Sequence, residues 1–103
     1  MNHNIYIHVS QKHIDTGERL SCLRCPVLLA INDCLKPEYQ ARMGRKRTLE
    51  LCLHDQWGRD ICQYVTRIPN DVLCFMVNFD DGKPVASFTF QLKQIPDRMI
   101  RSL

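Results

Sequence analysis

The sequence contains no apolar run long enough to cross a lipid bilayer. Its first residues, Met1 to Ile5, have neither the basic start nor the apolar segment of a secretion signal. These two absences argue against a membrane protein and against an exported one. We therefore expect a cytoplasmic protein that makes no contact with a membrane.

Recognisable catalytic motifs are also missing. The sequence has no glycine-rich phosphate loop, no nucleophile elbow, and no pair of carboxylates at helical spacing that also has a histidine partner. We therefore name no catalytic residue and expect a protein that is not an enzyme.

The length and the composition are those of one ordinary globular domain. The chain has 103 residues, of which 45% are hydrophobic and 24% are charged. A chain of this length can bury a core without disulfides or metal, and its apolar content argues against disorder. We predict a single domain over residues 1–103.

Two segments have the periodicity of amphipathic helices, and each is introduced by a proline. A proline fits the first position of a helix because the amide hydrogen that it lacks would have no partner there. The first segment begins at Pro26 and ends near Leu35, and it is apolar on almost every side, so we place it at the centre of the core. The second begins at Pro69 and ends near Asp80, with apolar residues at i, i+3, i+4 and i+7: Val72, Phe75, Met76 and Phe79.

Four other segments alternate apolar and polar residues as strands do: residues 4–9, 47–54, 61–68 and 85–92. Residues 38–46 show no clean period, so we expect a loop or a frayed helical extension there. The order β-α-β-β-α-β predicts a two-layer α+β sandwich, and the ferredoxin-like topology is the natural candidate for that order.

Three interpretations are possible for the roles of Cys22 and Cys25. With His13 from an adjacent turn they form a partial zinc site, although a fourth ligand is missing. They also have the spacing of a redox dithiol, in which the start of the helix would lower the pKa of Cys25. We favour a third interpretation, in which both cysteines only pack against their neighbours. We therefore expect no cofactor, with a bound zinc ion as the alternative.

The remaining cysteines and the basic residues give further expectations. Cys52, Cys62 and Cys74 lie in apolar-patterned segments, where free cysteine behaves as a small hydrophobic residue. A short segment gathers the cations Arg42, Arg45, Lys46 and Arg47, which predicts contact with the phosphates of a nucleic acid as one function.

Residues 55–60 are expected to form the turn of a hairpin, with Trp57 and Arg59 near its tip. Tryptophan and arginine are the side chains that most often anchor protein interfaces. The tip is therefore a second candidate for a partner-binding site.

Four motifs occur in a fixed order along the chain: His13-Ile14-x-x-Gly17, Cys22-x-x-Cys25-Pro26-Val27-x-Leu29-Ala30-Ile31, Ile68-Pro69-x-x-Val72, and Phe79-Asp80-x-Gly82-x-x-Val85-x-x-Phe88-x-Phe90-x-Leu92. In this order they resemble small uncharacterised proteins encoded by bacteriophages and prophages. The resemblance covers most of the chain, but the region from Lys36 to Gln63 carries none of it. That family has no assigned activity.

The resemblance implies an accessory protein in the cytoplasm of the host cell. Our first expectation is a non-enzymatic protein that binds a host or phage protein and modulates host defence or gene expression. The alternatives are a small nucleic-acid-binding module that uses the segment from Arg42 to Arg47, and an accessory protein stabilised by zinc.

Overall fold

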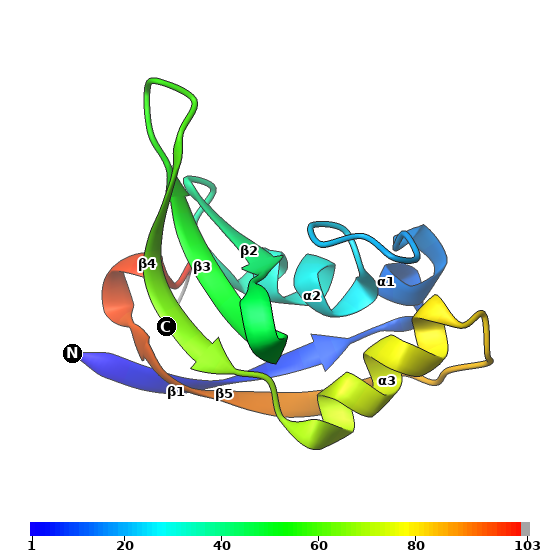
Figure 1. Ribbon diagram of the computed structural model, residues 1–103. Coiled ribbons are helices and arrows are strands. Elements are labelled where there is room, and N and C mark those ends of the chain that lie inside the picture. Colours follow the sequence, from blue (N-terminus) through cyan, green and yellow to red (C-terminus); the bar gives the residue numbers. More distant parts are fainter. Residues whose placement is uncertain (102–103) are drawn as a thin grey trace.

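Helix α2, Pro26–Cys34, forms the centre of the core in the computed structural model, which describes residues 1–101 (Figure 1). Cys25 is its N-cap and Pro26 occupies the first position, as the sequence predicts. Val27, Leu28 and Ile31 are each at most 2% exposed. The prediction of a central helix that begins at Pro26 is confirmed.

The strands form two antiparallel sheets (Figure 1). One sheet pairs β1 (Asn2–Val9) with β5 (Phe88–Pro96). The other has the order β2 (Tyr39–Met43), β3 (Thr48–His54) and β4 (Asp60–Arg67). Together with the helices they make an α+β sandwich, so the predicted fold class is confirmed.

Helix α2 joins the two sheets through its apolar side chains. A small apolar hollow of about 10 Å³ marks where they meet. Its wall combines Val27, Leu28 and Ile31 of α2 with Leu49 of β3, and with Phe90 and Leu92 of β5. Removing α2 would therefore expose the apolar faces of both sheets to water.

Two further helices flank this core. The short helix α1 (Gln11–Thr16) begins with a capping box. The Ser10 side chain accepts a hydrogen bond from the His13 backbone amide, and the His13 side chain accepts one from the Ser10 backbone amide. Helix α3 (Asn70–Asp80) buries the predicted apolar stripe, but Pro69 is its N-cap and not, as predicted, its first residue. The centroid of the Phe75 ring lies 4.7 Å from that of the Phe88 ring in β5. Within residues 1–101, no helix is both long enough and apolar enough to cross a membrane.

The segment from residue 38 to residue 46 differs from its prediction. It holds strand β2 and the start of a 3-10 turn, η1 (Arg45–Arg47), in place of a loop or a helical extension. Only Ala41 of β2 is fully buried, so the strand lacks the apolar alternation that marks strands in a sequence. Its pairing with β3 comes from tertiary structure.

Other sequence predictions also need correction. The described strands divide into two sheets and do not form the single four-stranded sheet of a ferredoxin-like fold. Strand β5 begins at Phe88 rather than at Val85. Cys52 is buried as expected, but Cys62 and Cys74 are exposed because they lie on the uncovered sides of β4 and α3.

Candidate interaction surface

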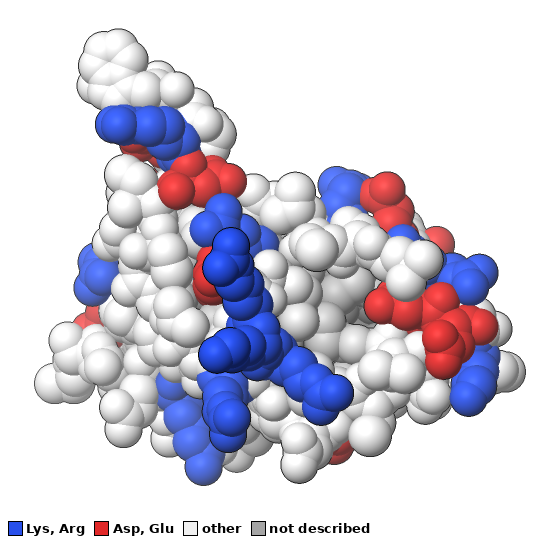
Figure 2. Space-filling model, viewed as in Figure 1, with Lys and Arg blue, Asp and Glu red and all other residues white. Residues whose placement is uncertain are grey.

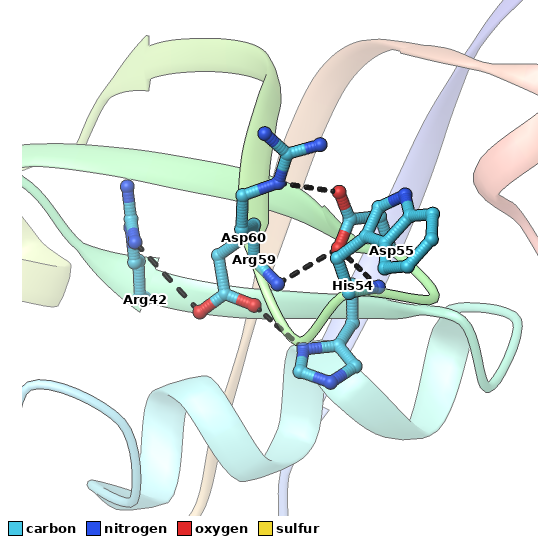
Figure 3. Close-up of polar contacts among 6 residues, drawn as sticks. Arg42, His54, Asp55, Arg59 and Asp60 are labelled. Carbon is cyan, nitrogen blue, oxygen red and sulfur yellow. Dashed lines mark hydrogen bonds and ion pairs between the residues drawn. The ribbon is translucent and has the colours of Figure 1, made fainter.

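The β3–β4 hairpin projects from the body of the protein and ends in a turn held by Asp55 (Figures 1 and 3). One oxygen of the Asp55 carboxylate accepts hydrogen bonds from the backbone amides of Trp57 and Arg59, at 2.9 and 2.8 Å. The other oxygen accepts a hydrogen bond from Nε of Arg59 at 2.9 Å. These hydrogen bonds, led by the Arg59 amide, lower the pKa of Asp55.

The turn leaves the Trp57 side chain in solvent. Trp57 is 73% exposed, and Gly58 beside it has φ +78, which is the left-handed conformation that glycine adopts without strain. An exposed indole on a turn with several internal hydrogen bonds loses little conformational freedom on binding. The predicted placement of Trp57 and Arg59 at the hairpin tip is confirmed.

Arg42 is paired with acidic groups on the outer face of the β2–β3–β4 sheet. Its Nε donates to Oε1 of Glu50 at 2.7 Å, and its guanidinium lies 3.9 Å from Asp60, which also contacts His54 at 2.9 Å (Figure 3). The Glu50 contact raises the pKa of Arg42 above its usual value. Arg42 therefore adds little free positive charge to the segment predicted to bind nucleic acid.

The next three cations form turn η1. Lys46 and Arg47 both adopt the left-handed region, with φ 54 and φ 61. This conformation costs an L-residue roughly 1–2 kcal/mol, so neighbouring contacts must hold it. Two such contacts are Thr48 Oγ1 donating to the Arg45 carbonyl at 2.7 Å, and the Ile68 amide donating to the Arg47 carbonyl at 3.3 Å.

A fourth cation, Arg67 at the end of β4, joins this turn because it pairs with Thr48 across the sheet. Lys46, Arg47 and Arg67 line a hollow of about 160 Å³ beside the first turn of α3. We define the basic face as the four residues Arg45, Lys46, Arg47 and Arg67. Figure 2 shows the band of Lys and Arg side chains that crosses this side of the molecule.

Within residues 1–101, the positive charges of the basic face have no acidic partner. In the part of the chain that the structure describes, none of its four members has a carboxylate oxygen within 4.0 Å. All four are exposed. Their charges are therefore available to a polyanion that approaches from solvent.

The predicted zinc ligands are not assembled. His13 has Ser10 at Nδ1 and Asp33 at Nε2, at 2.9 and 2.7 Å, so both ring nitrogens are engaged. Cys22 is exposed and Cys25 is buried. Among the described residues, no three-ligand cluster unites His13, Cys22 and Cys25.

The predicted activation of Cys25 is wrong as well. Burial raises the pKa of its thiol, and this effect outweighs the opposing effect of the nearby Leu28 and Val27 amides. The start of the helix does stabilise the thiolate, but the loss of hydration is larger. Cys25 therefore acts as a buried apolar cap, as the favoured packing interpretation predicts. The same interpretation is wrong for Cys22, which is exposed because it lies in the turn before the helix.

A larger hollow, about 540 Å³, lies between the end of α2 and strand β2, away from the basic face. Its lining mixes Asp33 and Glu38 with Lys36 and Arg101. Mixed charges of this kind select neither anions nor cations, so the size of this hollow does not make it the better candidate.

Arg67 is the member of the basic face that sequence reasoning missed. The missing information was the hairpin register, because the shift between Leu51 and Cys52 is what places Arg67, rather than Thr66, opposite Thr48. No family model matches this chain, and neither a curated protein nor a solved structure is found that resembles it. The likeness to phage proteins stays a prediction.

Proposed function

We propose that this chain is a non-enzymatic accessory protein of the host-cell cytoplasm that binds nucleic acid through its basic face. The observation that carries the proposal is the gathering of four exposed cations, without an acidic partner among residues 1–101, at the open end of the β3–β4 hairpin. Phosphate contacts by Lys and Arg supply most of the affinity of non-specific nucleic-acid binding.

Two features favour phosphate as the group that is bound. The hollow beside α3 is lined by three cations, and it lies at the amino-terminal end of a helix, where backbone amides favour an anion. Pro69, the N-cap of α3, makes no side-chain cap hydrogen bond. The N-cap side chain therefore does not compete with an anion for the first amides of α3.

The hairpin also carries an exposed aromatic group, Trp57, at the end opposite the basic face. Strand β4 runs for 8 residues from near the tip to Arg67, or about 26 Å at 3.3 Å per residue. That length corresponds to about seven or eight steps along a nucleic-acid strand. Trp57 can then stack on a base while the basic face holds phosphates farther along the strand.

A binding titration tests the proposal. Fluorescence anisotropy would follow the wild type with a labelled single strand and with a labelled duplex at low salt. The variant Arg45→Gln/Lys46→Gln/Arg47→Gln removes three charges but keeps side-chain length, and we expect it to lose most of the affinity.

A matched control separates a local effect from net charge. Lys12→Gln/Lys83→Gln/Lys93→Gln removes the same three charges from exposed positions outside the basic face, and we expect it to bind like the wild type. Equal losses in the two variants, or no binding of either oligonucleotide by folded wild-type protein at low salt, would overturn the proposal.

A second candidate function is binding of a host or phage protein through the hairpin tip, and the 73% exposure of Trp57 favours it. A partner recovered from host lysate by the wild type should then be lost with Trp57→Ala and kept with the neighbouring control Gln56→Ala. If Trp57→Ala retains the partner as well as the control does, the tip is not its binding site.

A further inference from the structure

Three side chains with metal-binding atoms converge on the outer face of the β3–β4 hairpin. A carboxylate oxygen of Glu50 and the sulfurs of Cys52 and Cys62 all lie within 4.8 Å of one another. Glu50 and Cys52 share this face because side chains alternate along β3, and Cys62 lies directly opposite Cys52 on β4. This cluster is separate from the basic face and from the Cys22 and Cys25 pair.

An irregularity in the hairpin brings the two cysteines together. The register shifts between Leu51, which pairs with Tyr64, and Cys52, which pairs with Cys62, so Gln63 is an extra residue in β4. Without this bulge Cys52 would face Gln63, and Cys62 would turn toward the inner face with Leu53. Bulges that re-aim a side chain in this way are common beside functional sites.

Glu50 is held in place by its surroundings. Arg42 donates to its Oε1 at 2.7 Å. Gly44 makes room for the other oxygen, because a Cβ at position 44 would lie only 2.4 Å from Oε2. The carboxylate is therefore positioned beside the two sulfurs before any ligand arrives.

We propose that Glu50, Cys52 and Cys62 bind a thiophilic divalent cation, of which Zn²⁺ is the chemical type. Two thiolates and a carboxylate match the ligands that zinc takes in proteins. Tetrahedral bonds of about 2.3 Å to sulfur and 2.1 Å to oxygen place ligand atoms roughly 3.6–3.8 Å apart. The observed cluster reaches that spacing by side-chain movements of about 1 Å.

The charges of the site also balance. The three ionised ligands carry three negative charges, the divalent cation contributes two positive charges, and the guanidinium of Arg42 beside Glu50 contributes one. Binding releases the two thiol protons to solvent. The ion then links β3 to β4 at mid-hairpin and keeps a fourth coordination position for water or another ligand.

Cobalt provides the probe. Reduced protein, made without a metal-binding tag, would be titrated with Co²⁺, and the charge-transfer absorption of cobalt thiolate would be recorded, followed by displacement with Zn²⁺. We expect one ion per chain and a higher melting temperature in the presence of Zn²⁺.

Serine variants identify the ligands. Cys62→Ser changes an exposed side chain and should abolish the thiolate absorption of a two-sulfur site. The affinity of the Cys62→Ser protein for the metal ion should fall by more than the roughly 10- to 100-fold that loss of an outer-shell partner causes. Glu50→Gln should weaken binding while it retains the sulfur absorption. The controls Cys74→Ser and Cys22→Ser, which also remove exposed thiols, should bind like the wild type.

The same experiment contains the results that would overturn the proposal. One is the absence of thiolate absorption in the folded, reduced wild type. Another is metal binding that survives Cys62→Ser but disappears with Cys22→Ser, which would move the site to the other pair. A third is conversion of Cys52 and Cys62 to a disulfide under reducing conditions, seen by mass spectrometry as loss of two hydrogens.

Discussion

The salt dependence of nucleic-acid binding gives the sharpest measure of the basic face. Each phosphate that a cation neutralises releases condensed counterions, so the logarithm of the affinity falls linearly with the logarithm of the salt concentration. The perturbation is removal of Arg45, Lys46 and Arg47 as the glutamine variants, which leaves Arg67 as the remaining cation of the face.

The structure fixes the expected magnitude. Four contacting cations predict a slope of about −3.6 for duplex DNA and about −2.8 for a single strand. Between 50 and 200 mM salt the affinity for duplex should then fall by about 150-fold. With Arg67 alone the slope should be about −0.9, and the same change of salt should cost only about 3- to 4-fold.

Anisotropy titrations at four or five salt concentrations give the slopes directly. The control Lys12→Gln/Lys83→Gln/Lys93→Gln should keep the wild-type slope, since its lysines lie outside the basic face. A triple glutamine variant of the basic face that keeps the wild-type slope would refute the assignment of phosphate contacts to these residues, whatever its absolute affinity.

Two predictions concern stability. Leu28→Ala, at a position that is 0% exposed, should lower the free energy of unfolding by about 2–5 kcal/mol, whereas Leu20→Ala at 79% exposure should change it by less than about 0.5 kcal/mol in denaturant titrations. The pKa of Asp55 is lower in the folded protein than in the unfolded chain, so its ionised form stabilises the hairpin above the unfolded pKa. That contribution is lost as the pH falls through the folded pKa, and Asp55→Asn should therefore be less sensitive to pH than the wild type between about pH 5 and pH 2, measured by denaturant unfolding. Equal acid sensitivity of the two proteins would show that the Asp55 contacts do not stabilise the fold.

Only part of the Glu50, Cys52 and Cys62 cluster could be predicted from the sequence. The alternation of β3 is visible in the sequence and puts Glu50 and Cys52 on one face. The partner Cys62 is not visible in that way, because the bulge at Gln63 reverses which side of β4 the cysteine occupies. A one-residue change of register moves a side chain to the opposite face, and nothing local in the sequence specifies this one.

Local patterns did determine the central helix, the hairpin with Trp57 at its tip and the apolar stripe of α3, because proline placement, turn residues and periodicity act within a few residues of one another. Tertiary structure alone decided the rest. Strand β2 forms because β3 offers it hydrogen-bond partners, and Arg67 joins Arg47 because two strands pair in one register. Such contacts depend on which distant segments the core brings together, and that information is spread over the whole chain.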